Sequence, residues 1–163
     1  MYYGLTSIGV IHTIISILAL GSGILALIDD KRITLDNAIG KFYVITTILV
    51  CITGFFIFQH GGFGKPHALG IITLIVLSIA FAASKKVNLF GKASPYIETI
   101  SYSLTVFFHV VPGITESVTR LPLDAPLAAS PDDPRIQMAI LICLVLFLIG
   151  AVSQVRALRK TRK

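Results

Sequence analysis

Residues 5–28 read LTSIGVIHTIISILALGSGILALI, an apolar stretch that contains no Asp, Glu, Lys or Arg. A helix needs about 20 predominantly apolar residues to cross the hydrocarbon core of a bilayer, which is about 30 Å thick. Backbone polar groups find no water in lipid, so such a segment must pair them within a helix. Comparable stretches recur, and we predict an all-α bundle of five transmembrane helices that forms one domain over residues 1–163. The predicted helices span residues 5–28, 39–59, 68–83, 98–118 and 136–155.

The composition favours a membrane protein over a soluble one. Of the 163 residues, 55% are hydrophobic and 13% are charged, too few charges to cover the surface of a soluble globule. The connections between the apolar stretches are too short for a soluble catalytic domain, and they carry no phosphate-binding loop or dinucleotide motif. No lysine lies inside an apolar stretch, which argues against retinal chemistry, and the isolated Cys51 and Cys143 indicate no disulfide framework. We therefore expect any chemistry to take place between the helices.

The net charge of +6 is unevenly distributed. Three basic residues follow the first apolar stretch, three follow the third and five lie in the tail 156–163, whereas the other side of a five-pass chain keeps Lys65, Arg120 and Arg135. Cytoplasmic loops carry the excess of Lys and Arg, so we expect the N-terminus outside and the C-terminus in the cytoplasm of a bacterial inner membrane. This distribution is explained by orientation, with no need for nucleic-acid binding. Because the chain has no Trp, we expect Tyr residues such as Tyr43 at the membrane surfaces.

Four histidines lie within or at the ends of the first four apolar stretches. His12 lies in the first, His60 closes the second, His67 opens the third and His109 lies in the middle of the fourth. At 1.5 Å per helical residue, His12 and His109 lie about 10 Å and about 15 Å below the same outer boundary. Ionisable side chains are costly in hydrocarbon, so an intramembrane histidine marks a functional site by default.

Small and polar residues share a helix face with two of these histidines. In the fourth stretch, this face consists of Tyr102, Thr105, His109, Gly113 and Glu116. In the first stretch, it consists of His12, Ser16, Ala19 and Gly23. Small residues let helices approach closely and polar residues avoid lipid, so we expect both faces to point into the bundle.

The favoured interpretation of the histidines is a haem b site. Two neutral imidazoles from different helices would bind the iron from opposite sides, either His12 with His109 or His67 with His109. Lys65 and the glycine-rich turn that contains Gly62 and Gly64 would orient the propionates at the outer surface.

Two other interpretations remain open. A copper or zinc ion could be held by three or four of the imidazoles of His12, His60, His67 and His109, together with Glu116 or an acidic residue of the outer loop. Alternatively, the histidines hydrogen-bond to neighbouring helices and hold no cofactor, which is the better interpretation for His60. Glu116 is a candidate catalytic group that takes protons, although an ion pair with Arg120, four residues on, is slightly favoured.

The pattern from His12 to Pro122 resembles an uncharacterised family of bacterial polytopic membrane proteins, a domain of unknown function. The resemblance rests on the histidine of the first stretch, the segment GSGILAL at 21–27 and the segment IGKFY at 39–43. It continues with His67, His109 and RLP at 120–122. In such relatives a histidine often precedes the Gly-Lys/Arg-x-Tyr element, whereas Asp36 occupies the comparable place here. The resemblance implies the membrane architecture and no particular activity.

We therefore predict a membrane protein that binds haem b and transfers electrons between membrane quinol and an outer acceptor, which would be an oxidoreductase activity. The alternatives are a protein that binds or transports a metal ion or small solute without redox change, and an accessory subunit of a larger complex. The expected partners are the lipid bilayer, quinol, and a second copy of the chain or a larger membrane complex.

Overall fold

A computed structural model of the protein describes residues 6–58, 62–85 and 87–161. The expected all-α fold is confirmed. Within the described residues the helices are α1 (Ser7–Asp29), α2 (Ala38–Gly54), α3 (Lys65–Ala83), α4 (Ser94–Arg120) and α5 (Pro134–Lys160), and a short 3-10 helix, η1 (Gly91–Ala93), precedes α4.

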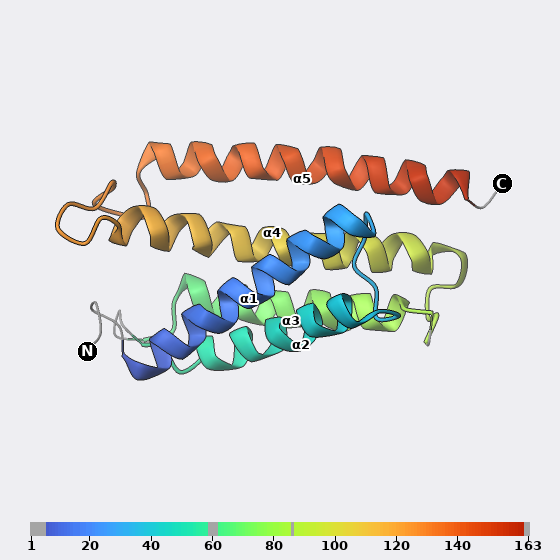
Figure 1. The fold of residues 1–163 in the computed structure, drawn as a ribbon, viewed down its shortest axis with the longest axis horizontal. Helices are drawn as coiled ribbons and strands as arrows, with labels where there is room; N and C mark the ends of the chain where they lie inside the picture. The colour runs from blue at the N-terminus through green and yellow to red at the C-terminus, as the bar shows by residue number, and fades with distance from the viewer. Residues whose placement is uncertain (1–5, 59–61, 86, 162–163) are drawn as a thin grey trace.

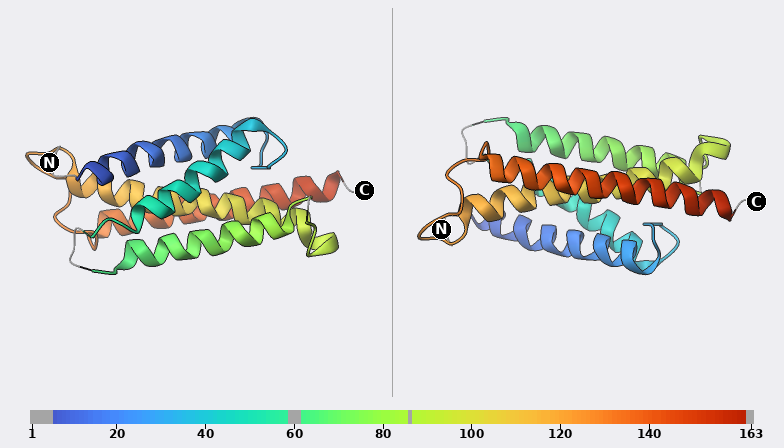
Figure 2. Two further views of the ribbon diagram at one scale, coloured as in Figure 1. Left: turned by 90° about the horizontal axis from the view of Figure 1, so that it is seen from below. Right: turned by 90° about the horizontal axis from the view of Figure 1, so that it is seen from above.

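The helices alternate in direction along the chain, so the two termini lie at opposite ends of an elongated bundle (Figure 1). We call these the N-terminal end and the C-terminal end. α1 packs mainly on α2 and also on α4, while α3 packs on α4 and α2. α5 packs extensively on α4 alone, and the views in Figure 2 show it along one side of the bundle.

Four of the helices are long and apolar enough to cross a membrane, namely α1, α3, α4 (with η1) and α5. The chain is thus a helical protein with the features of a polytopic membrane protein. α2 is apolar but has only 17 residues, which is the lower limit for a span.

The prediction that the second helix continues to residue 59 is wrong, because α2 ends at Gly54. The N–H groups of Phe55 and Phe56 bond to carbonyls three residues back, which tightens the chain into a turn. The Phe55 ring then packs against α3, where a β-carbon on Gly70 would lie 2.9 Å from it. Contact between helices therefore ends α2 before its apolar sequence is exhausted.

α3, α4 and α5 begin before their predicted limits, whereas α1 begins two residues after its predicted start. Polar side chains mark the starts of α2 and α5. The Asn37 side chain accepts a hydrogen bond from Gly40 N at 2.8 Å and begins α2. The Asp133 carboxylate accepts one from Arg135 N at 2.8 Å, and Pro134 follows as the first residue of α5. Proline at this position and Asp or Asn at the cap are the signals expected for a helix start.

Tyr43 of α2 is fully buried in the core, so its predicted place at the membrane surface is wrong. It lies against Gly23 of α1, where a β-carbon would be 2.8 Å from the Tyr43 ring. Glycine at this position lets α1 and α2 approach closely, and Val106 of α4 closes the third side of the contact.

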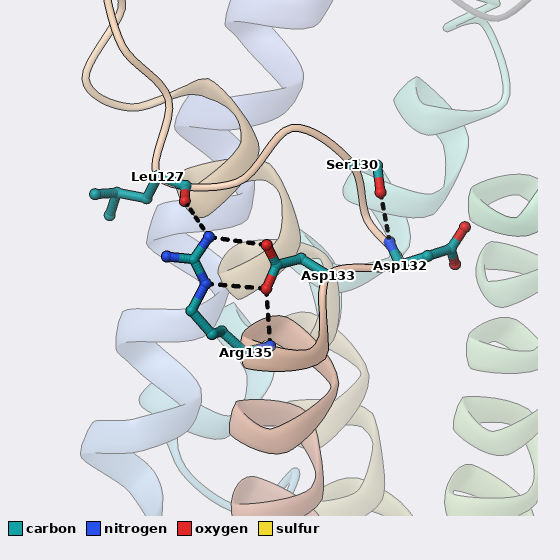
Figure 3. A network of polar contacts seen from close by, with 5 residues as sticks. All are labelled: Leu127, Ser130, Asp132, Asp133 and Arg135. Carbon is teal, nitrogen blue, oxygen red and sulfur yellow. Dashed lines mark hydrogen bonds and ion pairs between the residues drawn. The ribbon is translucent and has the colours of Figure 1, made fainter.

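The connection from α4 to α5 is organised by Arg135. Its guanidinium donates to the Leu127 carbonyl at 2.7 Å and to the Asp133 carboxylate at 2.8 Å (Figure 3). Ser130 accepts from the backbone N–H of Asp132 in the same loop. The Arg135 side chain therefore ties the long loop to the first turn of α5 at the N-terminal end.

Candidate functional site

His12 of α1 is hydrogen-bonded to α2. Its Nδ1 lies 3.0 Å from Thr53 Oγ1. The Thr53 hydroxyl has one proton, which it gives to the Leu49 carbonyl at 2.8 Å, so it accepts the proton of His12 Nδ1. A neutral His12 ring therefore keeps a lone pair on Nε2. The ring lies against Gly54, where a β-carbon would be 3.2 Å from it, so glycine makes room for the imidazole.

His109 of α4 belongs to a buried chain of hydroxyl groups. Its Nε2 lies 3.1 Å from Thr47 Oγ1 of α2. Thr47 lies one helical turn beyond Tyr43 on α2, and the Tyr43 hydroxyl lies 2.7 Å from Thr105 Oγ1 of α4. The Tyr43 ring meets the His109 ring edge-on, with 6.1 Å between centroids. We call His109, Thr47, Tyr43 and Thr105 the hydroxyl chain.

The proton position between Tyr43 and Thr105 follows from Thr105. Thr105 donates to the carbonyl of Tyr102 at 2.8 Å, so Thr105 Oγ1 accepts the proton of Tyr43. The contact between Thr47 Oγ1 and His109 Nε2 fits either neutral tautomer of the ring, with Thr47 as acceptor or as donor.

His67 lies in the first turn of α3 and is 6% exposed. Its Nδ1 accepts a hydrogen bond from Gly64 N at 3.2 Å, so the neutral ring carries its proton on Nε2. That Nε2 is buried and has no hydrogen-bond partner. The Phe58 ring stacks on the imidazole at an interplanar angle of 23°, and the Phe63 ring is tilted to it by 30°, with centroids 5.1 and 5.2 Å away.

The structure brings the described histidines together in part. His12 and His109 lie near enough for a charge on one to act on the other. His12 and His67 both border the end of α2, one against Gly54 and the other against Phe58. Among the described residues, no group of three or more His, Cys, Asp and Glu side chains is placed to hold a metal ion. His60, the fourth predicted metal ligand, lies outside the described residues.

The remaining predicted site residues lie at the N-terminal end. Lys65 is 95% exposed and pairs with Asp132 of the long loop at 3.8 Å. Gly62 and Gly64 are exposed. Glu116 pairs with Arg120, as the ion-pair interpretation expected.

The two predicted small and polar faces point into the bundle over most of their length. Ala19 and Gly23 of α1 are buried. Tyr102, Thr105 and His109 of α4 are buried as well, but Gly113 and Glu116 are exposed. The polar face of α4 thus leaves the protein interior one turn beyond His109.

Sequence reasoning missed the partners of the histidines. Tyr43, Thr47 and Gly54 lie on one face of α2, at intervals of four and seven residues. Helical spacing of polar and small residues in an apolar stretch was the signal that could have found them. Glu98 of α4 was treated only as a helix end, although it is buried.

A bundle of apolar helices with imidazoles and hydroxyls paired in its interior has the features of a polytopic membrane protein with a polar core. Comparison of the chain with protein-family models, curated proteins and solved structures gives no match. No family is therefore identified, and the function must be argued from the site.

Proposed function

We propose that this protein binds haem b near the N-terminal end of the bundle and transfers electrons between membrane quinol and an acceptor on that side. Bound haem supplies one-electron iron chemistry, whose potential depends on its axial ligands. The observation that carries the proposal is the state of His12. Donation from Nδ1 to Thr53 leaves Nε2 as a lone pair, the form that metal-ligating imidazoles take when a neighbour holds their other nitrogen.

His67 is the second axial ligand in this proposal. Its Nε2 is buried and unpartnered, and a single bond from the Gly64 backbone holds the ring in its present form. If His67 gave up the hydrogen bond from Gly64 N and carried its proton on Nδ1, its Nε2 would be free to bind iron. The loss of a typical hydrogen bond costs about 1 kcal/mol. His109 is less available, because its Nε2 is one end of the hydroxyl chain that joins α2 and α4.

Space for the macrocycle would come from residues 55–58, which follow α2 and are not helical. Lys65 would exchange its exposed partner Asp132 for a haem propionate, because an ion pair in water contributes little. Gly62 and Gly64 would let the backbone approach the propionates. Glu116 would take protons released by quinol oxidation.

The orientation in this proposal has the N-terminal end outside the cytoplasm of a bacterial inner membrane. The basic residues support it, because Lys31, Arg32, Lys85 and the tail of α5 all lie at the C-terminal end of the bundle. The resemblance to the uncharacterised bacterial membrane family agrees with this placement and adds no activity. Association with a second copy or a larger membrane complex is part of the same proposal.

The test is the optical spectrum of the purified full-length protein, produced in cells supplied with haem. We expect a Soret band that shifts when dithionite is added. His12→Ala should abolish the band and His67→Ala should alter it, whereas the control Thr13→Ala, on the exposed side of α1, should leave it unchanged.

Three other outcomes each have a meaning. A band lost in His109→Ala but kept in His67→Ala would replace His67 with His109 as the second ligand. A colourless protein with stoichiometric copper or zinc would favour the metal-binding alternative. A colourless, metal-free protein would refute cofactor binding and leave solute transport or an accessory role.

A further inference from the structure

A small hollow at the C-terminal end of the bundle is lined by charges of both signs. It has a volume of about 200 Å³ and lies between the end of α3, the beginning of α4 and the end of α5. Its lining is charged at Glu98, Arg32 and Lys85 and polar at Asn88, Ser94 and Thr161. Haem binding at the N-terminal end uses none of these residues.

Glu98 is the most deeply buried of the charged residues, with 8% of its surface exposed. Within the described part of the chain, its carboxylate has no hydrogen-bond or ion-pair partner. The carboxylate oxygens are not among the fully enclosed polar atoms, so they reach open space, and the hollow is the open space that Glu98 lines. A buried carboxylate is costly unless a cation pairs with it. The hollow therefore suits a ligand that brings a cation to Glu98.

The two basic residues of the hollow belong to different connections. Lys85 follows α3 and donates to the Asp36 carboxylate at 2.9 Å, which uses one of the three protons of its ammonium group. Arg32 follows α1 and is half-buried. Both side chains can donate hydrogen bonds to a phosphate, and the guanidinium can form two of them in parallel. The hollow thus offers donors for an anion as well as an acceptor for a cation.

The charges in and around the hollow cancel. Arg32 and Lys85 are positive, whereas Glu98 and the Asp36 partner of Lys85 are negative. A metal cation or an inorganic anion would leave the site with a net charge. A group that carries a phosphate and an ammonium a few bonds apart adds no net charge and pairs with both signs. The lining therefore matches a zwitterion.

An apolar groove along α3 reaches the same part of the molecule. It has a volume of about 530 Å³ and is lined mainly by apolar side chains such as Ile75. Ala82 and Leu89 line the groove, while their chain neighbours Ala83 and Asn88 line the charged hollow. The groove and the hollow therefore meet at the connection between α3 and α4. A ligand that is charged at one end and apolar at the other fits this arrangement.

We propose that the hollow binds the headgroup of a phospholipid that carries a phosphate and a primary ammonium, the phosphatidylethanolamine class. The ammonium donates to Glu98, the phosphate accepts from Arg32 and Lys85, and an acyl chain lies in the groove along α3. The hollow is at the end of helices long enough to cross a membrane, where lipid headgroups lie. This binding is separate from haem binding and does not depend on it.

The test compares lipids that differ only in the headgroup. The delipidated full-length protein in detergent is titrated with dihexanoyl phosphatidylethanolamine, phosphatidylcholine or phosphatidylglycerol, and native mass spectrometry measures the fraction that carries one lipid. Choline has the same charges as ethanolamine, but its ammonium has no proton to donate to Glu98. We therefore expect the ethanolamine lipid to bind at least about tenfold more tightly, because a hydrogen bond between charged groups is lost in the choline lipid.

Three variants assign this preference to residues. Glu98→Gln removes the negative charge at nearly constant volume and should abolish most of the preference for ethanolamine over choline. Arg32→Gln should weaken binding of all three lipids alike, because they share the phosphate. The control Asp124→Asn removes a carboxylate from the exposed loop at the N-terminal end and should keep the wild-type preference. Thermal scans without lipid check that each variant is folded.

The wild-type measurement alone can overturn the proposal, even if a variant fails to fold. Equal affinity for the ethanolamine and choline lipids would do so, and so would an unchanged preference in a folded Glu98→Gln. Tighter binding of phosphatidylglycerol would refute the zwitterion and leave a site for anionic lipid. Soluble phosphoethanolamine that binds as tightly as the ethanolamine lipid would refute the lipid and leave the free headgroup as ligand. None of these readouts involves a haem spectrum.

Discussion

The first four helices and α5 have similar hydrophobic sequences but pack in different ways. α1, α2, α3 and α4 enclose buried hydroxyls and imidazoles that bond between helices over 41 to 62 residues of sequence. In α5, only Ile136 is buried, and Leu141, Leu146, Ile149 and their neighbours are exposed. The four-helix part is therefore specified by polar pairs and small residues, whereas α5 packs on α4 and leaves most of its apolar surface exposed.

Hydrophobicity alone therefore does not decide which helices hold the candidate site. Lipid and protein interior are equally apolar, so association of helices in a membrane depends on close packing and hydrogen bonds. α5 packs along α4, where the Phe147 ring stacks on Phe107, but it makes few hydrogen bonds to the other helices. Its polar attachments are Arg135 at the N-terminal end and Gln154 near the C-terminal end, where Gln154 accepts from Ser103 and donates to the Lys31 carbonyl.

The largest difference between the two regions should come from a pair of glycine substitutions. A β-carbon on Gly40 of α2 would lie 1.9 Å from the Thr34 carbonyl oxygen, and backbone atoms cannot move aside cheaply. We expect Gly40→Ala to lower the free energy of unfolding by about 3 kcal/mol. Gly150→Ala in α5 meets nothing within 4 Å and should raise stability by up to about 1 kcal/mol. Thermal unfolding in detergent measures both free energies. Equal stability of the two variants would show that α2 and α5 do not differ in how tightly they are packed at these glycines.

Tyr43→Phe should have the next largest effect, because it breaks the hydroxyl chain inside the four-helix part. The loss of a buried hydrogen bond to Thr105 should cost about 1–2 kcal/mol. A double-mutant cycle with Thr105→Val isolates the pair, and additive effects would show that the two hydroxyls do not interact. Ser153→Ala in α5 removes an exposed hydroxyl bonded within its own helix and serves as the control.

Gln154→Ala should detach the C-terminal part of α5 while the other helices stay in place. The variant loses the bonds to Ser103 and to the Lys31 carbonyl, at an expected cost of about 1 kcal/mol. Hydrogen exchange followed by mass spectrometry should show faster exchange in α5 and unchanged exchange in α2. Faster exchange throughout the protein would mean that α5 is integrated with the other helices.

The smallest expected effect concerns the other attachment of α5 and depends on pH. Hydrogen bonds from the Arg135 side chain and backbone lower the pKa of Asp133 to about 2. A lowered folded-state pKa means that the charged carboxylate contributes stability above its ordinary value near pH 4, and that this contribution is lost as pH falls toward about 2.

Between pH 5 and pH 2.5, wild-type protein should therefore lose about 1–2 °C more in Tm than Asp133→Asn. Thermal scans at the two pH values measure the difference. Parallel pH curves for the two proteins would show that Asp133 does not attach α5.

Local sequence signals predicted the features that depend on neighbouring residues. The spacing of Tyr102, Thr105 and His109 placed them together on the inner face of α4. The interior position of Tyr43 was not predictable in this way, because an isolated tyrosine in an apolar stretch equally suits a membrane surface. The early end of α2 also escaped prediction, because packing of Phe55 on Gly70 causes it.

In the candidate site, too, some features follow from local sequence and others from tertiary contacts. The histidines stood out because ionisable residues are rare in apolar stretches, but the protonation state of each ring depends on a partner elsewhere in the fold. Thr53 fixes the form of His12, the Gly64 backbone fixes that of His67, and His109 Nε2 contacts Thr47. These partners decide which imidazole can offer a lone pair.

The sequence by itself determined that the chain forms long apolar helices, where most of them begin, and that positive charge gathers at one end. These properties depend on the length, hydrophobicity and capping of continuous segments. Only the tertiary structure decided that α5 makes few hydrogen bonds to the other helices, that Tyr43 joins α2 to α4, and that Thr53 holds His12. Each of these depends on atoms from separate helices within about 3 Å of each other, a distance set by helix packing rather than by local sequence.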